Sequence, residues 1–240
     1  MEFCLGNPEK IEGDVKCRHC PQVNFISQKT MVIDNKSRSE AKAILDKYKY
    51  FMTKCAKCGA ERFLIHPFFY VANSFKINGV EYGQWAIQLV NDGKEALEFA
   101  NYIDELRKMP EHKDDWTTYR VRVVWNRDDF YEKLRIVISL ADDRVIEHLR
   151  KRRKEELEKQ TGKKVIRSKF LFEDGKMTIC FEFKNFDDDV FEINQENYQN
   201  ALDELAKTLI MNNDDDIIVN HEMFDTKYLF NQAYKPIHQR

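Results

Sequence analysis

We predict an α+β protein with two parts, residues 1–95 and residues 96–240, and three observations lead to this fold class. Short runs of alternating apolar and polar residues, typical of strands, are interspersed with segments whose apolar residues recur every three or four positions, as on a helix. Turn signals join neighbouring runs, which favours antiparallel hairpins. Two cysteine pairs stand in the first part and none in the second. A chain of 240 residues is long enough for one large domain or two small ones.

The cysteine pairs are Cys17-Arg-His-Cys20 and Cys55-Ala-Lys-Cys58. A C-x-x-C pair at a tight turn directs two sulfurs to one point, and two such turns complete a tetrahedron around Zn²⁺. Gly59 supplies the permissive backbone that such a turn needs. The alternatives are two unrelated thiol pairs or a redox dithiol, but a redox pair normally begins a helix, whereas strand-like residues follow both pairs here. We therefore predict a zinc-ribbon-like region with one structural Zn²⁺ bound by Cys17, Cys20, Cys55 and Cys58.

Other cysteine and histidine residues have simpler interpretations. Cys4 could act as a spare ligand, although an unliganded thiol is the favoured interpretation. His66 is an alternative ligand, but a packed or surface histidine is the ordinary outcome at its position. The ring of His19 is expected to point outward, because the flanking sulfurs use the inward directions. Cys180 lies in an apolar strand-like run and is predicted to be a small buried side chain.

The first part is expected to contain an inserted helix. Residues 1–16 show no clear pattern and are predicted to be an irregular lead-in to the first cysteine pair. The segment between the pairs is longer than the about 15–20 residues of a compact ribbon, so we expect elements within it. Ser37 and Glu40 fit a capping box and precede apolar residues at helical spacing. We predict a strand near residues 30–34 and a helix near residues 38–49.

Beyond the second cysteine pair the pattern is that of strands. Pro67 interrupts an apolar stretch, and Asn78-Gly79 is a strong signal for a two-residue hairpin turn. The predicted strands span residues 61–65, 68–77 and 80–90.

The second part mixes helices with hairpins. Asp92 and Asn126 are predicted to cap two helices, because an acidic or amide side chain can accept from the free N–H groups of a first turn. Asp142 and Asp143 are predicted to start a third, because acidic groups suit the positive end of a helix. Gly162 is predicted to close the third of them. In order, we predict a helix after Asp92 that ends at Pro110, a strand over 117–125, helices after Asn126 and after Asp142, a hairpin of 165–172 and 176–184, a strand over 190–193, a helix over 195–210, a strand over 217–219 and a final helix.

The charge balance gives no general reason for nucleic-acid binding. The chain has 39 Lys and Arg residues against 41 Asp and Glu residues, a formal charge of −2. One basic run, 150–154, is either a patch for an acidic partner or a solvated helix end that pairs with the glutamates after it. We favour the solvated end. Its expected pairs are Lys151 with Glu155, Arg152 with Glu156, and Lys154 with Glu158.

The cysteine region resembles the bacterial CpXC proteins. The resemblance rests on the two pairs with a helix between them, on the aromatic stretch that begins at Pro67, and on Glu132-Lys-Leu-Arg-Ile136 with Asp142-Asp-Arg-Val-Ile-Glu147. The family is named for Cys-Pro-X-Cys, and Arg18 and Ala56 stand where that pattern has proline. The resemblance covers roughly residues 14–150 and implies a zinc-binding bacterial protein whose activity is not established.

The sequence leaves several functions open. The first is a protein-interaction or regulatory module braced by zinc, with a protein partner. The alternative is a nucleic-acid-binding zinc ribbon that uses basic residues near the cysteines. An enzyme is the least favoured, because four thiolates leave no open position on zinc and no catalytic motif is found. The basic candidates are Arg18, His19, Lys54, Lys57 and Arg62.

The expected compartment is the cytoplasm. Four paired cysteines suit a reducing environment better than a disulfide framework. We expect no membrane span, because no apolar run approaches about 20 residues, and no signal peptide, because the chain start lacks its basic and apolar regions.

Overall fold

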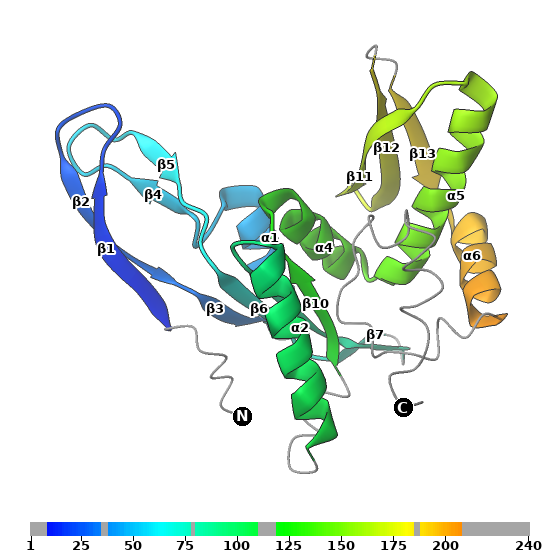
Figure 1. Cartoon of the computed structure of the whole chain (residues 1–240), viewed down its shortest axis with the longest axis horizontal. Helices are drawn as coiled ribbons and strands as arrows, with labels where there is room; N and C mark the ends of the chain where they lie inside the picture. Colours follow the sequence, from blue (N-terminus) through cyan, green and yellow to red (C-terminus); the bar gives the residue numbers. More distant parts are fainter. Residues whose placement is uncertain (1–8, 35–37, 78–79, 110–118, 185–187, 208–240) are drawn as a thin grey trace. The chain divides into compact units, whose positions relative to one another are not determined.

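A computed structural model describes residues 9–34, 38–77, 80–109, 119–184 and 188–207 (Figure 1). Helices are mixed with mainly antiparallel sheets, so the α+β class is confirmed. The predictions for Cys4, for the turn at 78–79 and for the chain beyond residue 207 lie outside the described residues. None of the described helices is long and apolar enough to cross a membrane.

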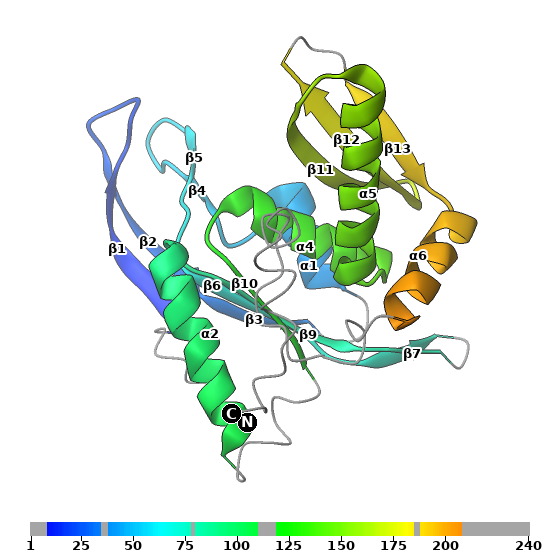
Figure 2. The ribbon, with the colours of Figure 1, turned by 45° about the vertical axis from the view of Figure 1, so that its right-hand side comes forward.

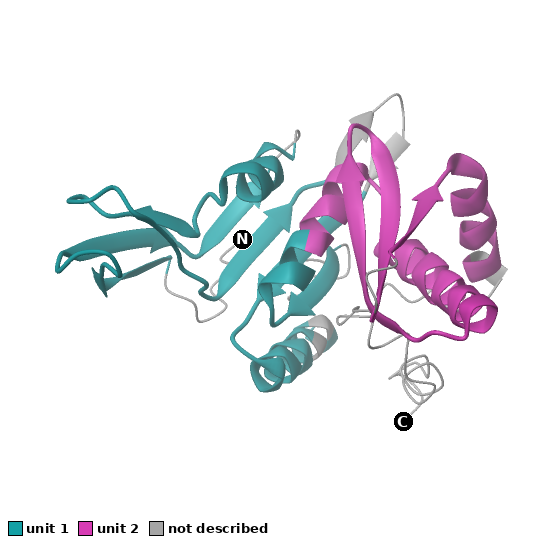
Figure 3. Ribbon diagram, turned by 90° about the horizontal axis from the view of Figure 1, so that it is seen from above, with its two compact units in different colours: residues 1–131 teal, residues 132–240 magenta. Residues whose placement is uncertain are grey.

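The chain divides into two compact units, Met1–Tyr131 and Glu132–Arg240 (Figure 3). The division falls within helix α4, Arg127–Ser139. The sequence pattern had predicted a division between residues 95 and 96. The difference has a structural reason: strand β10, Tyr119–Val124, pairs with β9, Gln84–Leu89, and so joins the sheet of the first unit.

Two hairpins carry the cysteine pairs at their turns, and we call them the cysteine hairpins. The first joins β1 and β2, and the second joins β4 and β5. Figures 1 and 2 show the two hairpins side by side. Their strands span Lys10–Lys16, Val23–Lys29, Met52–Lys54 and Glu61–Phe63.

Strand β1 corrects the prediction of an irregular lead-in. Its residues alternate between exposed and half-buried, and none of them is fully buried. Ile11 and Val15 are the apolar residues on its half-buried side, with Gly13 between them. Two apolar side chains around a glycine are too weak a period-2 signal to indicate a strand, which forms here by pairing with β2 along its whole length.

A four-stranded sheet forms the core of the first unit, with strand order β10-β9-β6-β3. Strand β6, Phe68–Ala72, is buried along its whole length and pairs antiparallel with β9 and parallel with β3, Met31–Asp34. Helix α2, Gly93–Lys108, packs on this sheet, where Phe99 lies 6.4 Å from Phe69 between ring centroids. Strand β7, Phe75–Ile77, pairs antiparallel with β8, Val80–Tyr82.

Helix α1, Ser39–Lys47, is the inserted helix that the sequence predicted, but its cap differs. Arg38 is the N-cap, in a left-handed conformation, and Ser37 lies outside the described residues. Asp34 Oδ2 accepts the Ala41 N–H at 3.0 Å instead. Glu40 is engaged elsewhere and accepts from Lys49 Nζ at 2.8 Å. A side chain from the end of β3 therefore satisfies an N–H group at the start of α1.

The second unit contains the rest of α4, helices α5 and α6, and a three-stranded antiparallel sheet. Phe170, Ile179 and Phe181 are its fully buried sheet residues. Cys180 is half-buried, which corrects the prediction of a buried side chain: strand alternation turns it away from the face that carries its two neighbours. The elements are α5, Asp143–Thr161; β11, Val165–Glu173; β12, Lys176–Phe183; β13, Asp189–Ile193; and α6, Gln195–Lys207.

The predicted starts of three later helices are confirmed. Asp92 accepts from the N–H groups of the first turn of α2, Asn126 accepts the Asp129 N–H at 2.8 Å, and Asp142 accepts the Arg144 N–H at 2.9 Å. Gly162 closes α5 in a left-handed conformation with φ of 65°. These helix ends could be predicted from the sequence because each depends on residues only a few positions apart.

Candidate metal centre

The four paired cysteines come together at the turns of the cysteine hairpins. Their sulfurs all lie within 4.8 Å of one another. The Sγ atoms of Cys17 and Cys58 are 3.7 Å apart, as are those of Cys20 and Cys55. A tetrahedral zinc site with Zn–S bonds of about 2.3 Å has sulfur–sulfur edges of roughly 3.8 Å. The cluster therefore has the dimensions of a four-thiolate metal site.

Backbone hydrogen bonds shape the first cysteine turn. The Cys17 N–H donates to Gln22 O at 2.8 Å and closes the hairpin end. The His19 N–H donates to Cys17 Sγ at 3.3 Å. N–H groups directed at sulfur stabilise the thiolate form that a metal requires.

The second turn has the same construction. The Cys55 N–H donates to Ala60 O at 2.8 Å, and the Gly59 N–H donates to Cys55 O at 2.9 Å. Gly59 has φ of 73°, in the left-handed region where a side chain is unfavourable. The glycine after the pair therefore has the backbone role that the sequence predicted.

Side chains join the two hairpins independently of any metal. Asn24 Oδ1 accepts the Ala56 N–H of the second turn at 3.0 Å. Arg62 donates through Nη1 to Lys16 O at 3.1 Å. Both contacts lie next to the cysteine turns and hold the two hairpins together there.

The thiols do not all favour the charged form. The N–H of Cys58 lowers the pKa of Cys55 to about 6, and the N–H of His19 lowers the pKa of Cys17. The N–H of Gln22 also favours a thiolate at Cys20, but burial and the neighbouring sulfurs outweigh it and raise that pKa to about 12. Four thiolates at this spacing repel one another, so a cation is needed for all four to be deprotonated together.

The comparisons place the chain in a family. The profile described as CpXC protein matches residues 15–150, more than half of the chain. The chain belongs to the CpXC family. Comparison with curated proteins gives no match, and comparison with solved structures gives none either.

The matched region of this CpXC protein runs past the cysteine hairpins and includes α4 and the first part of α5. It therefore covers all three features that carry the resemblance: the cysteine pairs, the aromatic stretch that begins at Pro67, and the segment from Glu132 to Glu147.

His66 lies outside the sulfur cluster. Its side chain is buried, with Nδ1 2.9 Å from Pro67 O and Nε2 3.0 Å from Tyr50 O. Its ring also packs against Phe51, with centroids 5.0 Å apart. This CpXC protein uses His66 as a packed residue of the first unit.

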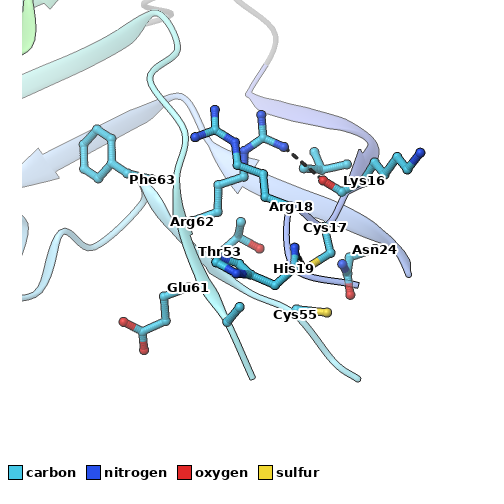
Figure 4. A pocket seen from close by; sticks show the side chains of 12 residues that line it. Lys16, Cys17, Arg18, His19, Asn24, Thr53, Cys55, Glu61, Arg62 and Phe63 are labelled. Carbon is cyan, nitrogen blue, oxygen red and sulfur yellow. Dashed lines mark hydrogen bonds between the residues drawn. The ribbon is translucent and has the colours of Figure 1, made fainter. Parts of the chain in front are cut away.

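A cleft of about 220 Å³ opens beside the cysteines, between the two hairpins (Figure 4). Three of the basic candidates from the sequence, Arg18, His19 and Arg62, line it. Lys54 and Lys57 are exposed and do not. Sequence reasoning missed the other polar lining residues, because strand alternation in β1, β2 and β4 brings them to the same side only in the folded hairpins. These are Lys16, Asn24 and Thr53.

A second group of charges was also missed, and it is buried within the second unit. Lys133 Nζ lies 3.1 Å from Asp143 and 3.5 Å from Glu147. Arg150 lies 2.6 Å from Glu132 and 3.2 Å from Glu147. Burial alone raises the pKa of Glu132, but the charge of Arg150 and the Phe170 N–H bring it below its ordinary value. We call these five side chains the buried ion cluster.

The basic run 150–154 therefore needs a correction at its first residue. Arg150 is buried in the ion cluster and is not part of a solvated helix end. The predicted pair of Arg152 with Glu156 is confirmed, at 3.5 Å from Nε to Oε1. Arg153 lies 3.3 Å from Asp189 of β13. The pairs expected for Lys151 and Lys154 stay predictions.

Proposed function

We propose that the first unit of this CpXC protein is a zinc-braced module that binds a partner protein. The observation that carries the proposal is the four-sulfur cluster at the turns of two hairpins. Thiolate ligands in tetrahedral arrangement select zinc over hard cations such as Mg²⁺ and Ca²⁺. The proposed ligands are Cys17, Cys20, Cys55 and Cys58.

Binding suits this centre better than catalysis. Four thiolates complete the coordination of zinc and leave no position for a water that could act as a nucleophile. The metal would then brace the hairpins, whose strands bury few of their own side chains. Thiolate ligands also persist best in a reducing compartment, which supports placing the protein in the bacterial cytoplasm.

The alternative function is nucleic-acid binding by the metal end of the cysteine hairpins. The observation that favours it is the concentration of cations there, with Lys54 and Lys57 beside the residues of the cleft. The formal charge of −2 for the whole chain opposes it.

Affinity capture from the native host tests the proposal. The tagged, metal-loaded chain is used with and without nuclease, and Cys55→Ser, which removes one ligand, is the matched variant. We expect a discrete protein that the wild-type chain retains after nuclease treatment and that Cys55→Ser loses. Recovery of nucleic acid alone, with every bound protein released by nuclease, would support the alternative and contradict the proposal.

A further inference from the structure

The cleft between the cysteine hairpins contains cations that the chain itself does not neutralise. Among the described residues, the side chains of Lys16, Arg18 and His19 make no hydrogen bond or ion pair. Arg62 makes one hydrogen bond, through Nη1 to Lys16 O, and its buried Nε has no partner in the described structure. Glu61 is the acid that lines the cleft, and no described cation pairs with it.

The negative charge of the metal centre would neutralise only part of this positive charge. One Zn²⁺ with four thiolates carries a net charge of −2. Residues 16–23 and 54–62, which form the two cysteine turns and their flanks, contain five cations and one acid, so positive charge remains once that centre is counted. These residues are Lys16, Arg18, Lys54, Lys57 and Arg62, with Glu61.

The phenylalanine ring that lines the cleft already packs against three other side chains. Phe63 is the phenylalanine at its wall. The Arg127 guanidinium lies 5.4 Å from the centre of its ring, Phe51 stacks on it at 5.7 Å, and Tyr48 meets it edge-on at 5.6 Å. Proteins that bind single-stranded nucleic acid without sequence preference use exposed rings on which bases stack.

The size and chemistry of the cleft suit a carboxylate. Its volume of about 220 Å³ is below the roughly 300–1,000 Å³ of ordinary small-molecule pockets. An arginine guanidinium binds a carboxylate through two parallel hydrogen bonds. Figure 4 shows Arg18 and Arg62, which come from different hairpins, extending in the same direction at the cleft.

We propose that this cleft binds an acidic peptide segment of a partner protein, with aspartate or glutamate carboxylates held by Arg18 and Arg62. The inference rests on the proposed function, since it names the kind of partner that the zinc-braced module would recognise. The metal would contribute by fixing the distance between the hairpins that carry the two arginines.

Fluorescence anisotropy with the full, metal-loaded chain tests this inference. The probe is a labelled peptide of alternating glutamate and glycine, and its matched control has glutamine for glutamate. We expect the glutamate peptide to bind, with an affinity that falls as the salt concentration rises. It should bind about ten-fold more weakly to Arg18→Gln, because a charge-assisted hydrogen bond is lost. Lys10→Gln, an exposed position of β1 away from the cleft, is expected to leave the affinity unchanged.

Arg62 needs a second variant, because its side chain also joins the hairpins. Arg62→Gln is expected to weaken peptide binding about as much as Arg18→Gln. Arg62→Lys keeps the positive charge at this position. It therefore separates the effect of losing the charge from the effect of losing the hydrogen bond to Lys16 O. Metal content is measured on every variant, and we expect it to equal that of the wild type.

Several outcomes would overturn the inference. Equal effects of Arg18→Gln and Lys10→Gln would mean general charge attraction and no defined site. Tighter binding of a labelled oligothymidylate, weakened by Arg18→Gln, would assign the cleft to nucleic acid. If a partner protein is captured but Arg18→Gln does not affect its capture, the cleft is not its site, while the proposed function stands. If no partner is captured and no peptide binds, both proposals fail.

Discussion

The cysteine hairpins and the buried ion cluster both concentrate ionisable side chains. The hairpins gather groups of one kind, whereas the ion cluster mixes acids with bases. The hairpins bring together four thiols that can only become negative. The ion cluster sets Lys133 and Arg150 against Asp143, Glu147 and Glu132, so that every charge in it lies beside one of opposite sign. A group of like charges needs an ion from outside the chain, whereas a group of opposite charges does not.

This difference separates a candidate functional centre from a structural one. Both groups lie within the region matched by the CpXC family. The ion cluster is enclosed within the second unit, where its members bind one another and Glu132 also accepts the Phe170 N–H at 2.8 Å. The hairpin cysteines lie at turns, beside a cleft whose cations have few partners. We therefore propose ligand binding for the cysteine hairpins and expect the buried ion cluster to stabilise the second unit.

Metal removal should have the largest effect on stability, and this effect should be confined to the cysteine hairpins. Structural zinc contributes about 10–16 kcal/mol of apparent binding energy in finger peptides, against roughly 5–15 kcal/mol of net stability for a whole domain. A strong chelator should therefore unfold the cysteine hairpins and leave the second unit folded. Hydrogen exchange resolved by peptide measures this. Equal loss of protection in β1 and in β12 would remove the distinction between the regions.

Loss of one charge from the ion cluster should have the next largest effect, confined to the second unit. Glu132→Gln removes a partner of the buried Arg150 and should lower the free energy of unfolding by about 3 kcal/mol. Denaturant unfolding measures this, and metal content should not change. Glu156→Gln is the matched control, because Glu156 is exposed and its pairs contribute at most about 1 kcal/mol.

The ion pair of Glu132 with Arg150 predicts that the stability of the second unit depends on pH. The pKa of Glu132 is lower in the folded chain than its ordinary value of 4.5. Its contribution to stability is therefore complete above that value and is lost as pH falls through the lower folded pKa. Acid unfolding of the wild type should be steeper than that of Glu132→Gln between pH 4.5 and the folded pKa. Parallel curves would show that the pair does not stabilise the unit.

A strained backbone at the second cysteine turn should have the smallest effect, and this effect should be a lower affinity for the metal. Gly59→Ala forces a side chain into the left-handed region at about 1–2 kcal/mol, which corresponds to a zinc affinity roughly ten-fold lower. Gly13→Ala is the control: Gly13 lies in β1, and a methyl group there meets no atom within 4 Å. Competition with a chromogenic chelator measures both, and equal affinities would show that the turn is not strained.

The parts that the sequence predicted well are those decided over short distances. The caps at Asp92, Asn126 and Asp142 act within one helical turn. The hairpin predicted from 165–172 and 176–184 turns at Asp174 and Gly175, which both have a left-handed backbone. The cysteine pairs were identified because their spacing alone indicates metal binding.

The parts that it missed depend on contacts distant in the sequence. Glu132 and Arg150 appeared to be ordinary charges on a helix, and only the packing of α4 against α5 buries them together. Asp34, which satisfies the start of α1, was likewise assigned only to a strand. The cleft exists because two hairpins that are more than 20 residues apart in the chain face each other, a geometry that no local pattern encodes.

Metal stoichiometry tests the central claim most directly. We expect freshly purified, reduced protein to contain about one Zn²⁺ per chain by elemental analysis and native mass spectrometry, released by acid or by a chelator as the thiolates take up protons. Cys55→Ser should lose the metal together with the order of the cysteine hairpins, whereas Cys180→Ser should retain it, because Cys180 lies outside the cluster. Metal-free wild-type protein, or zinc bound normally by Cys55→Ser, would contradict the four-thiolate site.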